Sequence, residues 1–410
     1  MMHVVLVEPR FPANQRQFVR ALAEVGATVT AIGEGSKDSL DDEMRHYLTH
    51  YEEVRNVCDE SAVLRAVRFA QQFKAVDRIE ATVEAHILST AKVREAAGIP
   101  GTSYRTAFLC RDKPAMKEVL RAGGIACAAS TGAATAAQVR AFAEQVGYPL
   151  MIKPRDGAGA SGATRVDSDA ELEAAIRSSG LGHPGRSVAV EEFIEGHEGF
   201  YDTLTYKGQV VHEFVSHYYP NVLESMRTRW ISPYLVSTNR VDLAPGYNEI
   251  KAMGQRVGEL LGIETSATHM EWFFGARGLK FSEIGCRPPG VRTWDLHNVG
   301  NDMDLYREWA MLLCHGRPSQ RPSRRFSTGI IALRPNCDGR IAGYEGWDAI
   351  RRRFADQLID AHLPPVGTPT QGVDAGYMAN AWLRMKHESY DELRGIFDLV
   401  GRTLKVHAHG

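Results

Sequence analysis

The sequence predicts a mixed α/β protein built from several domains. One hydrophobic core is usually too small for 410 residues, so two to four domains are expected. At the N-terminus, residues 3–7 form an apolar strand, residues 14–26 have an apolar helical face, and residues 27–32 form another strand. This order is typical of a doubly wound parallel sheet. Further along the chain, two apolar β-type runs within residues 267–287 read as a β-hairpin.

Composition and charge exclude several classes of partner. Hydrophobic residues make up 44% of the chain and charged residues 24%, as in soluble globular proteins. The formal net charge of -2 provides no field that would recruit nucleic acid or a membrane. No apolar run reaches the length of a transmembrane helix, and residues 1–8 read as a strand rather than a signal peptide. We therefore expect a cytoplasmic protein without nucleic-acid or membrane partners.

The cysteines indicate neither a zinc site nor a disulfide framework. No two of them have C-x-x-C spacing, and reduced thiols are the default for a chain without a secretory signal. Cys286 and Cys314 lie near the candidate site described below. We interpret them as small core residues rather than nucleophiles. The six cysteines are Cys58, Cys110, Cys127, Cys286, Cys314 and Cys337.

The remaining elements follow from periodicity and turn residues. Glu8-Pro9-Arg10-Phe11-Pro12 follows the first strand, where a dinucleotide site would need G-x-G-x-x-G, so an NAD-type site is disfavoured. Polar and proline-containing residues 316–325 read as a linker. The expected helices are 112–123, 135–146, 168–178 and 246–262, and the expected strands are 149–153, 164–166, 187–194, 200–206 and 209–215.

Two glutamates twelve residues apart, Glu271 and Glu283, carry the main chemical signal. Each lies among bulky apolar residues, where an unpaired charge is costly to bury. Nucleotide-bound Mg²⁺ usually takes one or two carboxylates together with phosphate oxygens. The pair therefore predicts a magnesium site, and the alternative is two solvated surface glutamates.

This site requires a particular register. If Phe274 paired with Leu279 and the strands stayed regular, Met270 would face Glu283 and Glu271 would point to the other side of the sheet. A shared metal needs Glu271 opposite Glu283, and hence an odd loop or a β-bulge. We predict that register.

A lysine followed by a glycine-rich loop gives a second signal. Lys153 ends a predicted strand, and Asp156-Gly-Ala-Gly-Ala-Ser-Gly162 leads into the next strand. Glycines let backbone N–H groups approach phosphate closely. The loop is not a Walker-type sequence, because no helix follows it directly. It predicts either a lid over a nucleotide or an ordinary flexible turn.

Three further features fit a nucleotide site. Lys113 follows the predicted helix cap Asp112 and is either a phosphate ligand or a surface lysine. Residues 190–198 form a strand and glycine bend that could hold adenine and ribose, or an exposed acidic turn. Arg287 lies four residues after Glu283, and arginine binds carboxylate or phosphate bidentately.

In this order, Asp112-Lys113, Lys153 with its loop, Glu191 to Glu198, Glu271 and Glu283-x-x-x-Arg287 resemble the ATP-grasp superfamily. The form Glu283-Ile-Gly-Cys-Arg-Pro-Pro-Gly290 is most similar to the L-amino acid ligase and carboxylate–amine ligase branch. The resemblance implies a Rossmann-like N-terminal domain, a lid subdomain, an ATP-grasp core with the metal site, and a small C-terminal αβ module. The expected bounds are 1–108, 109–186, 187–315 and 326–410.

The resemblance also implies roles for single residues. Glu271 and Glu283 would bind Mg²⁺, or Mn²⁺ in its place. Gly285 stands where many members have a third metal ligand, Asn, so the number of metal ions is open. Arg287, Lys153 and Ser161 would be catalytic, with Arg287 stabilising an acyl phosphate. The residues expected to bind ATP are Lys113, Lys153, Ser161, Gly162, Glu191, Phe193, Ile194 and Glu198.

The implied activity is ATP-dependent ligation of a carboxylate to an amine, releasing ADP and phosphate. The expected partners are small carboxylate and amine substrates, with a homodimer as one option. Variable loops build the substrate pockets of this superfamily, and residues 217–240 are the candidate for such a loop. Two alternatives stay open: a carboxylase-type enzyme that activates bicarbonate, and an ATP-binding module without catalysis. A dinucleotide oxidoreductase is disfavoured because the glycine fingerprint is missing.

Overall fold

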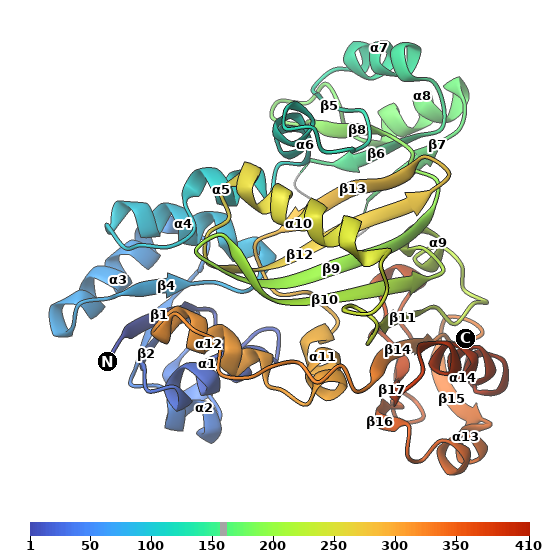
Figure 1. Ribbon diagram of the computed structural model, residues 1–410. Helices are drawn as coiled ribbons and strands as arrows, with labels where there is room; N and C mark the ends of the chain where they lie inside the picture. The colour runs from blue at the N-terminus through green and yellow to red at the C-terminus, as the bar shows by residue number, and fades with distance from the viewer. Residues whose placement is uncertain (156–161) are drawn as a thin grey trace.

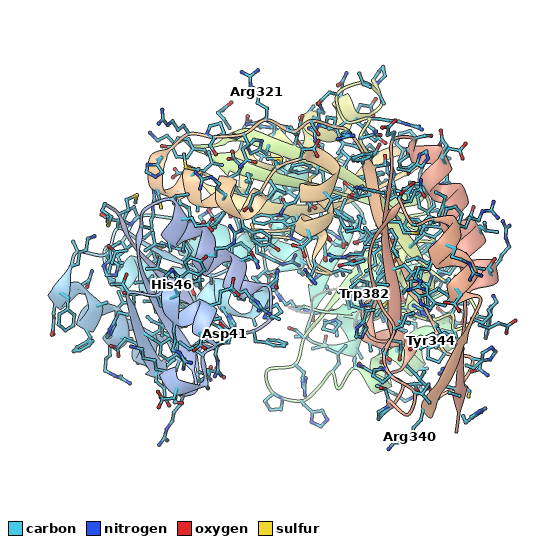
Figure 2. All side chains as sticks on the ribbon, turned by 90° about the horizontal axis from the view of Figure 1, so that it is seen from below. Asp41, His46, Arg321, Arg340, Tyr344 and Trp382 are labelled. Carbon is cyan, nitrogen blue, oxygen red and sulfur yellow. The ribbon has the colours of Figure 1, made fainter. Side chains whose placement is uncertain are left out.

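The computed structural model describes residues 1–155 and 162–410, and within these ranges the strands form four sheets. Figure 1 shows an N-terminal domain, a lid-like layer, a long central sheet and a C-terminal region that continues that sheet. Seen from below in Figure 2, the N-terminal domain with Asp41 and His46 and the C-terminal strands with Tyr344 and Trp382 lie on opposite sides of the molecule.

The N-terminal domain is a parallel sheet in the order β3-β2-β1-β4. All five residues of β1 are buried, as expected for the central strand of a sheet covered on both faces. The predicted doubly wound start is therefore confirmed. Its elements are β1 (His3–Val7), α1 (Gln15–Glu24), β2 (Thr28–Glu34), α2 (Asp42–Tyr47), β3 (His50–Val54), α3 (Glu60–Phe73), β4 (Arg78–Glu80), α4 (Ile87–Ala96) and α5 (Tyr104–Leu109).

A four-stranded antiparallel sheet, β5-β8-β6-β7, forms the lid-like layer. Its helices cover one face with an apolar core that includes Phe142, Leu172 and Val190. The segment that joins β6 to β7 contains residues 156–161, which lie outside the described residues. The elements are α6 (Lys113–Ala122), β5 (Ser130–Ala133), α7 (Ala136–Val146), β6 (Leu150–Pro154), β7 (Thr164–Val166), α8 (Asp169–Ser178) and β8 (Val188–Glu192).

The central sheet has eight strands in the order β13-β12-β9-β10-β11-β14-β17-β16. In the region 326–410 three strands extend the central sheet, and two others, β15 (Arg340–Glu345) and β18 (Lys405–His409), form a separate two-stranded sheet. The domain bounds given above stay predictions. The strands are β9 (His197–Tyr206), β10 (Gln209–Tyr219), β11 (Tyr234–Ser237), β12 (Ser266–Gly275), β13 (Gly278–Gly285), β14 (Ser327–Leu333), β16 (Leu358–His362) and β17 (Ala381–His387).

Helix α10 (Tyr247–Leu261) covers one face of this sheet (Figure 1). It packs on Tyr201, Met270 and Trp272, which alternate with residues on the other face. The approach is close at Gly254, where an added Cβ would lie 2.4 Å from the Tyr201 ring. The opposite face carries Glu271 and faces the candidate site.

Two helices return the chain from the hairpin to the N-terminal domain. The sequence did not predict α11 (Thr293–Asn301) or α12 (Leu305–His315). In α12, Trp309 and Leu312 join the core around Phe18 of α1, so α12 lies beside α1 (Figure 1). Helix α9 (Val222–Ser225) lies between β10 and β11. The remaining elements of the C-terminal region are β15 (Arg340–Glu345), α13 (Trp347–Arg353), α14 (Tyr390–Thr403) and β18 (Lys405–His409).

None of the helices in residues 1–155 and 162–410 combines the length with the apolar character needed to cross a bilayer.

Candidate functional site

A cavity of about 430 Å³ lies between the lid-like sheet and the face of the central sheet opposite α10. Its volume is in the range typical of small-molecule sites. Further lining comes from residues 221–224, 227 and 228 of the predicted substrate loop. The sequence-predicted residues that line it are Lys113, Lys153, Phe193, Glu198, Glu271 and Glu283.

Glu271 and Glu283 face each other across the β12–β13 hairpin. Phe274 pairs with Leu279 and Trp272 with Phe281, but Ser282 is then an extra residue, so Glu271 pairs with Glu283. This is the β-bulge that the sequence analysis required, and the predicted register is confirmed. The bulge places both carboxylates on the side of the sheet that lines the cavity.

Glu198 adds a third carboxylate to this face. It lies on β9, pairs with Phe273 of β12, and is 6% exposed. Its Oε2 accepts a hydrogen bond of 2.6 Å from the backbone N–H of Val222. Burial and the neighbouring Glu271 raise the pKa of Glu198 to about 8. The site therefore concentrates negative charge, and a bound cation would relieve it.

Lys113 brings positive charge to the opposed carboxylates of Glu271 and Glu283. It is the first residue of α6, and its Nζ lies 3.4 Å from Oε2 of Glu283. The predicted cap is confirmed, because the Asp112 side chain accepts from the backbone N–H of Ala115. Arg155 donates to Asp112 at 2.6 Å and ties the start of the helix to the lid-like sheet.

A buried ion-pair cluster holds Lys153. Its Nζ donates to Oε2 of Glu191 at 2.9 Å, and Nζ of Lys117 lies 2.7 Å from the other carboxylate oxygen. Burial alone would raise the pKa of Glu191, but the two lysines lower it to about 2. Lys117 is 1% exposed and was missed by the sequence analysis. Its position one helical turn after Lys113 was the available signal.

The run predicted to bind adenine divides into two parts. Phe193 lines the cavity, and the Arg165 guanidinium lies 4.3 Å from the centre of its ring. The Glu191 side chain instead contacts Lys117 and Lys153, as described above. Ile194 is partly buried and follows Phe193 without being among the residues that line this cavity.

The glycine-rich loop is only partly described. Gly162 has a φ of +71°, and an added Cβ would lie 2.9 Å from the Pro154 side chain. Glycine is therefore required there by both conformation and space. Ser161, predicted to be catalytic and to bind ATP, lies outside the described residues.

Arg287 lies beside the cavity of about 430 Å³ and forms an ion pair with the N-terminal domain. Its Nε donates to Oε2 of Glu84 at 2.6 Å, and Arg111 donates to the other oxygen of Glu84 at 3.1 Å. Burial would raise the pKa of Glu84, but the two arginines lower it. Glu84 was not predicted from the sequence, because it lies about 200 residues away from Arg287 along the chain and outside any motif.

Three neighbouring cavities share lining residues. A small cavity of about 20 Å³ shares Lys113 and Glu283 with the cavity described first. It shares Glu84 and Arg287 with a third cavity of about 380 Å³. The third cavity opens at the carboxyl ends of β1 and β4, where the strand order of the parallel sheet reverses and ligands commonly bind.

A buried hydrogen-bond network of Asp202, His269 and His297 lies next to Glu271. Asp202 accepts from His269 at 2.7 Å and from His297 at 2.8 Å, with the ring tautomers set by this shared acceptor. Nε2 of His269 lies 3.8 Å from Glu271. Burial lowers the pKa of His269, but Asp202 more than offsets this and raises it to about 9. The network fixes β12 where it carries Glu271.

The donor set fits a hard divalent cation completed by phosphate oxygens. In residues 1–155 and 162–410 no group of three or more His, Cys, Asp or Glu is arranged to hold a metal alone. Two opposed carboxylates beside a cavity with two lysines are what nucleotide-bound Mg²⁺ uses. Glu271 and Glu283 would hold such an ion.

Comparison with known proteins identifies the class. The family model of the carbamoyl-phosphate synthase L chain, ATP binding domain, matches residues 112–200, which include Lys113, Lys153, Glu191 and Glu198. Over its whole length the chain superposes on solved ATP-grasp structures. The protein has the ATP-grasp fold.

The relatives point to one branch. The chain is 27% identical over 250 residues to the L-arginine-specific L-amino acid ligase of Bacillus subtilis, a match that covers 60% of this chain and 59% of that one. It is 25% identical over 291 residues to the alanine–anticapsin ligase of Bacillus subtilis, covering 64% and 59%. Each match thus spans less than two thirds of the ligase.

A solved structure covers more of the chain. The L-amino acid ligase from Bacillus licheniformis has a TM-score of 0.77 at 17% identity and covers 100% of this chain and 99% of that one. Phosphoribosylglycinamide synthetase from Anaerococcus prevotii has a TM-score of 0.68 at 14% identity and covers 100% of both chains. These likenesses support the fold.

Proposed function

We propose that the protein is an ATP- and Mg²⁺-dependent carboxylate–amine ligase that acts on amino acids. The observation that carries the proposal is the opposed pair Glu271 and Glu283 in a cavity with Lys113 and Lys153. The similarity to two amino acid ligases supports the substrate class.

ATP would bind in the first cavity. Phe193 packs against the base, Glu198 accepts from the ribose hydroxyls, and Lys113 and Lys153 hold the phosphates. Ser161 and Gly162 belong to the loop that covers the phosphates. Glu271 and Glu283 would hold Mg²⁺, which when bound neutralises the charge that develops during phosphoryl transfer.

The acid and the amine would occupy the cavity of about 380 Å³, which adjoins the small cavity beside Glu283. In the first step a carboxylate oxygen attacks the γ-phosphorus, the bond to the β-phosphate oxygen breaks, and ADP leaves. In the second step the amine attacks the acyl carbon, the acyl–oxygen bond breaks, phosphate leaves, and the nitrogen releases a proton. Arg287, which lines both cavities, stabilises the acyl phosphate.

The protein mainly positions the reactants and excludes water. No covalent protein intermediate is needed, and the fixed donors need not reorganise during the reaction. Water exclusion matters because an acyl phosphate hydrolyses easily.

A phosphate-release screen over amino acid pairs with Mg²⁺ and ATP tests the proposal. We expect release that depends on both an acid and an amine, with a ligated product seen by mass spectrometry. Release that depends on bicarbonate instead would support carboxylase-type chemistry. ATP binding without ADP formation for any pair would support a non-catalytic module. The Glu283→Ala variant serves as the inactive control.

A further inference from the structure

Two buried thiols meet beside the candidate site. Sγ of Cys110 and Sγ of Cys286 are 2.9 Å apart, although the residues are 176 positions apart in the sequence. Cys110 caps the C-terminus of α5, and Cys286 directly follows β13. Each residue is 5% exposed. Neither thiol has a role in the proposed ligation.

We propose that Cys110 and Cys286 form a site of oxidative modification, at which a peroxide converts the two thiols into a disulfide. One sulfur attacks a peroxide oxygen, the O–O bond breaks, and a sulfenic acid and one water form. The second sulfur then displaces the hydroxyl as a second water and forms the S–S bond. The two thiols lose two protons and two electrons, and the peroxide takes them up.

The geometry requires only a small movement. An S–S bond is about 2.05 Å long, so the sulfurs must approach by about 0.9 Å from the 2.9 Å of the reduced pair. Cys110 and Cys286 each line a separate cavity of about 20 Å³. Such a space holds about one water-sized molecule, which suits hydrogen peroxide better than a bulky disulfide reagent.

The thiols are expected to react slowly at neutral pH. The hydrogen bond with Cys286, together with burial, raises the pKa of Cys110 well above its usual value. Because the thiolate is the nucleophile, the rate of oxidation should rise as the pH increases from 7 to 9. The exposed Cys58 will react independently of the pair.

The disulfide would connect two segments of the site. Cys110 lies three residues before Lys113, and Cys286 directly precedes Arg287. A displacement of about 1 Å in a reacting group can cost about 100-fold in rate. The effect on turnover rests on the proposed ligase function, whereas the disulfide itself does not.

The chemical test uses the full chain with Cys58→Ser, which removes the exposed thiol. After reduction, the protein is treated with hydrogen peroxide, and free thiols and non-reduced peptides are analysed. We expect two thiols to disappear, a linked peptide that joins Cys110 to Cys286, and full recovery with dithiothreitol. Free Cys110 and Cys286 after treatment, or linkage to other cysteines, would overturn the proposal.

Matched variants separate the pair from the other cysteines. Adding Cys286→Ser should leave Cys110 without a linked partner, and Cys110→Ser serves if the first variant does not fold. Adding Cys127→Ser, a partly buried cysteine outside the pair, should leave the linkage unchanged. Linkage that persists in Cys286→Ser would contradict the assignment.

The functional arm compares reduced and oxidised protein. We expect at least a tenfold loss of turnover on oxidation, reversed by dithiothreitol and absent in Cys286→Ser. If the reduced protein shows no turnover with any pair, the ligase proposal fails, and nucleotide binding measured by thermal shift becomes the readout. A linked peptide with unchanged turnover and unchanged nucleotide binding would show that the disulfide does not reach the site.

Discussion

Glu271 lies directly opposite Glu283 on the neighbouring strand, because Ser282 is accommodated as a bulge in β13 between Phe281 and Glu283. Without the bulge one carboxylate would lie under α10, among Met270 and Trp272. With it, both carboxylates line the same cavity as Lys113 and Lys153. The function proposed for this protein depends on that local irregularity.

Replacing either metal glutamate should stop the reaction without unfolding the protein. We expect Glu283→Gln and Glu271→Gln each to lower kcat by roughly 100-fold to 1,000-fold, since each removes electrostatic stabilisation from the transition state. Both should also need more Mg²⁺ for half-maximal rate. Glu259→Gln, on the exposed face of α10, is the matched control and should behave as the parent. Full activity in Glu283→Gln would refute the metal role.

Lys113→Gln should weaken ATP binding. A hydrogen bond to a charged group contributes about 1.5–3 kcal/mol, which corresponds to about 10-fold to 150-fold in affinity. Calorimetric titration with a non-hydrolysable analogue measures the change. Lys207→Gln removes an exposed lysine from the turn between β9 and β10 and controls for net charge. Equal affinities for the two variants would show that Lys113 does not contribute to ATP binding.

Glu198 should make stability depend on pH in an unusual direction. Its pKa is raised to about 8 in the folded protein, against about 4.3 when unfolded. The folded state therefore binds the extra proton, and this glutamate lowers stability progressively as pH rises from about 5 to 8. In urea unfolding, the free energy of unfolding of Glu198→Gln should therefore increase relative to that of the parent as the pH rises over that range. A stability difference that stays constant between pH 5 and 8 would contradict this.

Glu191 should act in the opposite direction. Its pKa is lowered to about 2, so its ion pairs with Lys117 and Lys153 stabilise the fold above the unfolded pKa of about 4.3. This contribution is lost as pH falls from about 4.3 to 2. Glu191→Gln leaves a buried lysine without its charged partner and should cost about 3–5 kcal/mol at pH 7. Urea unfolding at pH 7 with a cost below 1 kcal/mol would show that the cluster is not buried as described.

The sequence allowed the fold and most of the cavity to be predicted, because the motifs are local. The strand with Lys153, the helix cap Asp112 and the glutamate hairpin each follow from spacing within a few residues. The register of the hairpin was also predictable, since only one register serves a shared metal.

The missed residues are those whose role depends on distant segments. Lys117 reads as a surface lysine until the fold brings α6 close to β8, where Nζ of Lys117 lies 2.7 Å from Glu191. Glu84 becomes part of the site only when the N-terminal domain packs against the loop carrying Arg287. The continuity of the central sheet into β14 and β17 is likewise a long-range pairing that no local pattern reports.

The most direct test is a crystal structure with a non-hydrolysable ATP analogue and Mn²⁺, read by anomalous scattering. We predict a Mn²⁺ peak in contact with carboxylate oxygens of both Glu271 and Glu283 and with phosphate oxygens of the analogue. A nucleotide bound elsewhere, or a metal peak that neither glutamate touches, would contradict the account.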